Sequence, residues 1–83
     1  MALFNELVQK QMKTMDKLLY LQAEIERCQK LKEELTALQD EAKVESIKQE
    51  IVKMKEELYQ IQKQFEAQTD EVIQSYRDFN AIV

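Results

Sequence analysis

The sequence contains neither glycine nor proline in its 83 residues. Most tight turns, strand hairpins and phosphate-binding loops depend on one of these two residues, because they require a positive or a fixed φ angle. Their absence argues against a β-rich fold and against a nucleotide-binding loop. Glutamine, glutamate, lysine, leucine, alanine and methionine dominate instead, and these residues favour helix. The composition therefore predicts an all-α chain.

Histidine is also absent, and Cys28 is the single cysteine. One chain can therefore form neither an internal disulfide nor a zinc site built from several Cys and His ligands. No combination of nucleophile, base and orienting group can be named. The sequence thus predicts a non-enzymatic protein with no catalytic, metal-binding or cofactor-binding residues. Cys28 lies on an apolar seam and is expected to be a small buried hydrophobe, with a redox role as the alternative.

The chain also lacks a strong charge of one sign. Its formal net charge is -4, and acidic and basic residues are spread evenly over both halves. A nucleic-acid binder would show a basic stripe, so no nucleic-acid partner is expected. No run of about 18 apolar residues is present, so no transmembrane segment is predicted, and a cytoplasmic location is expected. Lys10, Lys13 and Lys17 beside a broad apolar face leave a membrane-surface role open, against the overall negative charge.

Apolar residues recur with heptad spacing in both halves of the chain, which is typical of a helix packed along a partner helix. The repeat is nearly unbroken from Val44 onward and less regular before it. The predicted core of the helix pair consists of Phe4, Leu7, Leu18, Leu21, Ile25, Cys28, Leu35, Ile47, Ile51, Met54, Leu58, Ile61, Phe65, Val72 and Phe79.

The two repeats lose phase in the segment LQDEAKVES, residues 38–46. Their frames differ by two residues, which would move the apolar stripe by about 200° around one straight helix. A chain reversal explains this shift, so we predict one domain, residues 1–83, that folds as a long antiparallel helical hairpin. Its helices are expected at about 3–40 and 46–81, with a turn at about 41–45 and a possible capping box at Ser46 and Gln49.

A reversal about Lys43 sets the pairing of the two helices. It places Cys28 opposite Leu58 and Gln11 opposite Ser75, so that apolar residues meet apolar residues and polar residues meet polar ones. In the same register Leu7 faces Phe79.

A second apolar stripe lies beside the core seam near both ends of the chain, and in a hairpin these ends are neighbours. The predicted association interface consists of Val8, Met12, Met15, Leu19, Ile73 and Tyr76. Two helices cannot bury both stripes unless they curve, and an exposed apolar patch usually marks an association site. We therefore predict that two hairpins associate into a homodimeric four-helix bundle.

The predicted function is a coiled-coil protein–protein interaction or scaffold module that self-associates. The alternative is an adapter or chaperone-like subunit that presents the same patch to a different protein, for which Met12 and Met15 would provide an adaptable surface.

The stretches TMDKLLYLQAEIERCQ and DEVIQSY resemble the YgaB-like family of small uncharacterised proteins from spore-forming Gram-positive bacteria. The resemblance covers most of the chain. It implies a short, soluble bacterial protein, and it assigns no catalytic or ligand-binding residue to any position here.

Overall fold

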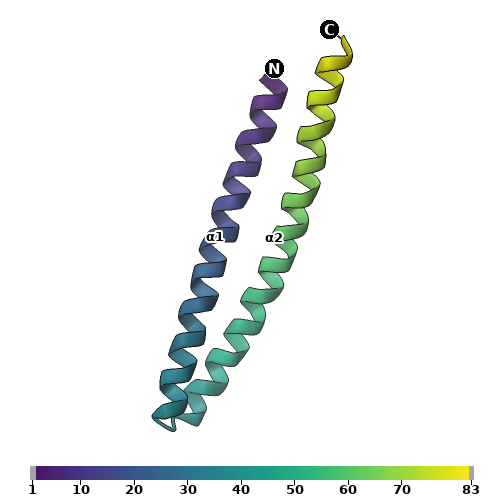
Figure 1. Cartoon of the computed structure of the whole chain (residues 1–83). Coiled ribbons are helices and arrows are strands. Elements are labelled where there is room, and N and C mark those ends of the chain that lie inside the picture. The colour runs from purple at the N-terminus through teal and green to yellow at the C-terminus, as the bar shows by residue number, and fades with distance from the viewer. Residues whose placement is uncertain (1, 83) are drawn as a thin grey trace.

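The computed structural model describes residues 2–82, with side chains described for residues 2–80. Helix α1 spans Ala2–Ala37 and helix α2 spans Glu41–Ile82. The two helices run antiparallel from a short connection, so both chain ends lie at the same end of the molecule (Figure 1). The hairpin measures 65 × 14 × 12 Å, and this length is close to that of a 42-residue helix at 1.5 Å per residue.

The chain reverses at Leu38–Asp40 without a glycine. Gln39 has a φ of 59°, the left-handed conformation that usually requires glycine or asparagine. The amide of Gln39 donates to the carbonyl of Thr36 at 3.0 Å, and the amide of Asp40 donates to the carbonyl of Leu35 at 3.1 Å. These two bonds form a Schellman motif, which satisfies carbonyl groups that the end of α1 would otherwise leave unpaired.

Asp40 ends the turn and begins α2. Its Oδ1 accepts a hydrogen bond from the backbone N–H of Lys43 at 3.3 Å, and its carbonyl accepts the first helical bond, from Val44, at 3.0 Å. Asp40 is therefore the N-cap of α2. The turn predicted at 41–45 is wrong, because this segment is the first turn of α2. Ser46 lies inside the helix and does not cap it.

The position of the turn can be tested by substituting Gln39 with glycine. We expect Gln39→Gly to stabilise the hairpin by about 0.5–1 kcal/mol, because glycine adopts a positive φ without a steric cost. Thermal unfolding followed by circular dichroism should show the midpoint rise by about 2–8 °C. Gln49→Gly, at an exposed site inside α2, should instead cost about 1 kcal/mol. If both substitutions destabilise equally, Gln39 is part of a continuous helix and the turn is elsewhere.

The hydrophobic core lies between the middle of the hairpin and the turn. Its buried cluster consists of Leu21, Ile25, Cys28, Ile51 and Met54, with Ile47, Leu58 and Ile61 packed against it. Leu18 is buried as well. The other predicted core residues within the paired region are only partly buried, namely Phe4, Leu7, Leu35, Phe65 and Val72. No apolar side chain among residues 2–13 or 55–80 is buried, and none among residues 29–50 is buried either. The buried side chains are therefore concentrated near the middle of the hairpin, and the end that carries the termini has none.

The observed register differs from the predicted one by one heptad. A turn centred on Gln39 places Ile51 opposite Cys28, where the sequence predicted Leu58, seven positions further on. Both Ile51 and Cys28 belong to the buried cluster. A shift of seven residues returns each helix to nearly the same face, so the residues of the seam stay the same while their partners change.

The shift leaves the last turns of α2 without a partner on α1. Phe79, predicted to face Leu7 in the core, is 40% exposed. α2 is longer than α1 by six residues, 42 against 36, and its C-terminal end extends past the N-terminus (Figure 1). The assignment of Phe79 to the core is therefore wrong. Because the chain turns earlier than predicted, α1 has no residue left to lie opposite Phe79.

A polar layer separates the buried cluster from the terminal end. The side-chain amide of Gln11 donates to the hydroxyl of Thr69, whereas the predicted register placed Gln11 opposite Ser75. Thr14 is 4% exposed, and its hydroxyl is bonded to a backbone carbonyl of its own helix. The buried Oε1 of Gln68 has no hydrogen-bond partner among the described residues. Polar groups at core positions typically select one register at a cost in stability, and we expect this layer to do the same.

Candidate interaction surface

On α1, four apolar side chains follow the core seam on one side. Val8, Met12, Met15 and Leu19 are spaced by four, three and four residues, so they share one stripe of the helix. Met12 is 62% exposed, Leu19 is 56% exposed and Met15 is 37% exposed, while Val8 is half-buried. This stripe is therefore apolar surface that the hairpin does not cover.

On α2, Ile73 and Tyr76 lie beside the seam and are also exposed. The rings of Phe4 and Tyr76 are in contact, with centroids 6.1 Å apart and planes tilted by 51°. Together with the Gln11–Thr69 hydrogen bond, this contact shows which edge of α2 borders α1 on this side. The stripes of the two helices thus lie on the same side of the hairpin. We call Val8, Met12, Met15, Leu19, Ile73 and Tyr76 the apolar face.

A hollow of about 710 Å³ opens at the end of the apolar face. Its walls are mostly apolar, and its lining residues are Phe4, Val72, Ile73, Tyr76, Arg77 and Asn80. Because α2 extends past α1 here, the hollow is bordered by one residue of α1 and by a longer stretch of α2. It is a place where another apolar side chain could pack.

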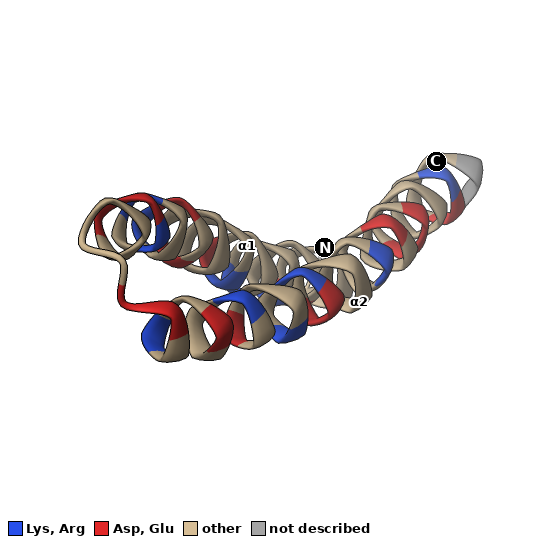
Figure 2. Cartoon of the chain, turned by 90° about the horizontal axis from the view of Figure 1, so that it is seen from below, with Lys and Arg blue, Asp and Glu red and all other residues tan. Residues whose placement is uncertain are grey.

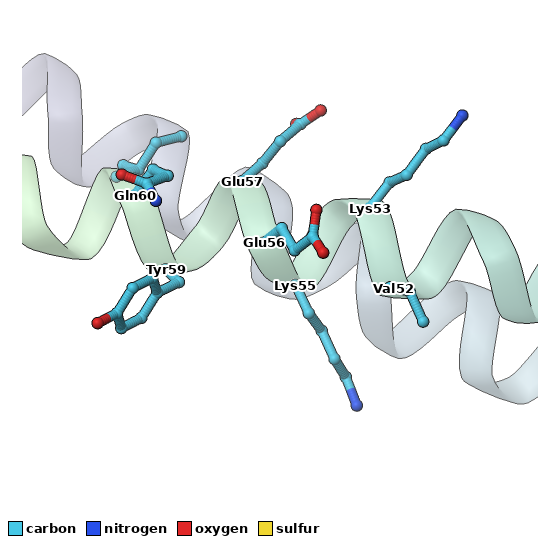
Figure 3. Close-up of a pocket in the computed structure, with 8 residues that line it drawn as sticks. Val52, Lys53, Lys55, Glu56, Glu57, Tyr59 and Gln60 are labelled. Carbon is cyan, nitrogen blue, oxygen red and sulfur yellow. The ribbon is translucent and has the colours of Figure 1, made fainter.

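A larger hollow, about 810 Å³, lies over the outer surface of α2 (Figure 3). Its lining residues project in different directions and do not enclose a cavity. Lys55 and Tyr59 point to one side of the helix, together with Val52, whereas Lys53 and Glu57 point to the other (Figure 3). Val52 and Tyr59 are 56% and 54% exposed. They extend the surface on the side of the apolar face toward the turn.

Sequence reasoning did not include Val52 and Tyr59 in the interface. The heptad spacing of the sequence could have identified both residues, since Tyr59 lies two heptads and Val52 three heptads before Ile73. Other exposed apolar residues, including Leu3, Tyr20 and Leu31, lie on the opposite side of α1 and belong to no continuous stripe.

The charges of α1 are distributed unequally between its two sides. The positions of the apolar face and those that continue it, from Asn5 to Gln22, carry no charged residue. Lys10, Lys13 and Lys17 all lie on the other side of the same helix. Over the whole molecule both signs occur along both helices (Figure 2). The absence of charge is therefore a local property of this side of α1, and such a surface costs little free energy to remove from water.

The ion pairs of the surface join residues that are close in the sequence. Glu24 accepts a hydrogen bond from Arg27 at 2.6 Å, and this bond together with its negative charge raises the pKa of Arg27. Lys43 lies 3.7 Å from the carboxylate of the capping Asp40. Among residues 2–80, no group of three or more His, Cys, Asp or Glu side chains is placed to hold a metal ion. Cys28 is a free thiol, 8% exposed, within the apolar cluster.

Neither helix, over the part of the chain that the structure describes, is long and apolar enough to cross a membrane.

Comparison with known proteins places the chain in a family. A family model described as YgaB-like protein matches residues 3–79. The chain is 47% identical over 77 residues to the "Uncharacterized protein YgaB" of Bacillus subtilis (strain 168), a match that covers 93% of this chain and 68% of the relative. No solved structure matches the chain. The match over nearly the whole hairpin shows that this chain belongs to the YgaB-like protein family.

Proposed function

We propose that this protein is a non-enzymatic coiled-coil scaffold module that self-associates through its apolar face. The observation that carries the proposal is the incomplete core at the terminal end of the hairpin. Among the described residues, every buried side chain belongs to residues 14–28 or 51–54, whereas the segments near both termini keep apolar residues exposed on one side. If two such hairpins packed face to face, the exposed apolar side chains of each would be buried against those of the other.

The size of the chain supports the same conclusion. A single hairpin of 83 residues buries a small fraction of its apolar surface, and its one cysteine cannot form a disulfide within the chain to stabilise it. Four-helix bundles solve this problem by surrounding a central core with helices on all sides. Association of two hairpins would bury Met12 and Leu19, which are among the most exposed large apolar residues of the molecule.

A second candidate function is an adapter that presents the same surface to a helix of a different protein. The hollow beside Phe4 and Tyr76 favours it, because it is open, mostly apolar and of a size to accept side chains of a partner. The two candidates differ in the state of the purified protein alone.

The deciding measurement is the mass of the purified protein in solution, by size exclusion with light scattering over a range of concentrations. We expect a mass of about twice the 9.9 kDa of one chain. The fraction of dimer should rise with concentration and persist at high salt, since apolar burial drives the association. If the protein is still monomeric at about 100 μM, a concentration at which weak association is detectable, self-association is contradicted. The adapter would then be the better candidate.

A further inference from the structure

Beyond the apolar face, toward the turn, the same surface carries charges of opposite sign on the two helices. Glu26 and Glu33 lie on α1, and Lys48 and Lys55 lie on α2. All four side chains are exposed, and none takes part in an ion pair among residues 2–80. One hairpin therefore presents two glutamates on α1 beside two lysines on α2, and Glu41 and Glu45 share that side of α2 nearer the turn.

Heptad spacing shows that these charges continue the apolar face. Glu26 lies one heptad after Leu19, and Lys55 lies three heptads before Tyr76. Residues one heptad apart occupy nearly the same side of a helix. Figure 3 agrees for α2, since Lys55 points to the same side as Tyr59. A partner that covers the apolar face along its whole length would also cover these charges.

The level of each residue along the hairpin follows from two contacts near the termini. The Phe4–Tyr76 ring contact and the Gln11–Thr69 hydrogen bond join residues at equal heights, and both give the same register. In this register, each step of one residue toward the turn on α1 corresponds to one step toward the turn on α2.

Extended to the charged half, the register places Glu26 within one residue of the height of Lys55, and Glu33 within one residue of the height of Lys48. Helical side chains lean toward the N-terminus of their own helix. The glutamates therefore lean away from the turn and the lysines lean toward it. Because each lysine lies slightly further from the turn than its glutamate, the two side chains of each pair lean toward each other.

We propose that a second copy of this chain lies alongside the first with both turns at the same end, related by a twofold axis that runs along the hairpin. In this arrangement α1 of each copy faces α2 of the other. Glu26 and Glu33 then face Lys55 and Lys48 of the second copy, and the two apolar halves cover each other. The inference rests on the self-association proposed above and adds its orientation.

Two other arrangements of the same faces fit the charges less well. Full overlap with the turns at opposite ends would place Glu26 and Glu33 of one copy over the apolar half of the other, which would remove unpaired charges from water. End-to-end overlap of the apolar halves alone would leave all four charged side chains without a partner. The side-by-side arrangement is the one in which all four of these charged side chains meet the opposite sign.

The test exchanges the charges in two separate variants. The first is Lys48→Glu with Lys55→Glu, and the second is Glu26→Lys with Glu33→Lys. Each variant alone would bring four like-charge pairs together across the twofold axis, so we expect its dimer dissociation constant to rise about tenfold or more at low salt. An equimolar mixture should regain the wild-type affinity, since every pair across a mixed dimer is again of opposite sign. Sedimentation measures both, and circular dichroism verifies that each variant remains helical.

The outcomes separate the orientation from the association itself. Weakened single variants together with recovery in the mixture would support the side-by-side dimer. A wild-type dimer whose affinity is unchanged in both variants, or variants that are weakened without recovery in the mixture, would overturn the orientation and leave the self-association intact. A wild-type protein that is monomeric would overturn the proposed function, and the orientation with it.

Discussion

Replacing Ile25 with aspartate is expected to unfold the hairpin at room temperature or to lower its thermal midpoint by about 15 °C or more. Ile25 is 7% exposed and packs in the cluster that contains Cys28, Ile51 and Met54. The substitution removes buried apolar atoms and places a carboxylate in a cluster whose side chains carry no cation. The combined cost is about 4 kcal/mol or more, a large part of the total stability of a small domain.

The matched control is Ala23→Asp, two residues away on the exposed side of α1. It introduces the same charge into the same helix but leaves the buried cluster intact, so its effect should stay within about 1 kcal/mol. Circular dichroism at 222 nm during heating measures both variants. Equal losses of stability in the two would mean that the helix does not pack in the cluster described here.

Replacing Met12 with aspartate is expected to dissociate the proposed dimer and leave the hairpin folded. Met12 is 62% exposed in a single hairpin, so aspartate there disturbs little within one chain. In a twofold dimer the change occurs twice, and each carboxylate would be taken out of water without a cation nearby. We expect the dimer dissociation constant to rise about 100-fold or more. Light scattering should then report a monomer at concentrations where the wild type is dimeric.

Met15→Asp should act in the same direction. Because Met15 is less exposed, at 37%, this variant should also lower the stability of the hairpin somewhat. The control for both is Tyr20→Asp, which replaces a large side chain that is 65% exposed on the other side of α1. It should leave the dimer unchanged. If Tyr20→Asp dissociates the protein while Met12→Asp does not, the association surface lies on the side opposite the apolar face.

The reversal of the chain was predictable because it depends on a pattern that accumulates over many residues. Each repeat extends over several helical turns, so the direction of its apolar stripe does not depend on any single residue. The angle between the stripes of the two repeats is large, and one atypical residue does not change it much. The position of the turn was not predictable in the same way. The prediction placed the reversal about Lys43, with a possible cap at Ser46, but Ser46 is an interior residue of α2, and the cap is Asp40.

The error in the turn did not disturb the list of core residues on α1, because a shift by one heptad preserves the faces of both helices. Leu18, Leu21, Ile25 and Cys28 are buried in the observed register, although each has a different partner from the predicted one. At the far end of α2 the same shift matters, since Phe79 extends past α1. Sequence periodicity thus specifies which side of a helix is covered and is insensitive to displacements of whole heptads along it.

The apolar stripes beside the seam were visible in the sequence, since they depend on the same periodicity. Whether the two stripes lie on the same side of the hairpin depends on how α1 pairs with α2. The contacts of Phe4 with Tyr76 and of Gln11 with Thr69 establish this pairing. The charged continuation of the face, with glutamates on α1 and lysines on α2 at matching heights, requires the register as well. An error of one heptad moves every such pair apart by about 10 Å.

The sequence by itself therefore determined that the chain is helical, that it reverses near its middle and which side of each helix is apolar. These properties follow from composition and from periodicity within one helix, which every residue reports locally. Only the tertiary structure decided where the chain turns and which residues face each other. The left-handed conformation of Gln39 and the cap by Asp40 are stable only as parts of one connected turn, and several heptad registers bury similar seams, so the choice among them depends on the turn and on the polar layer at Gln11 and Thr69.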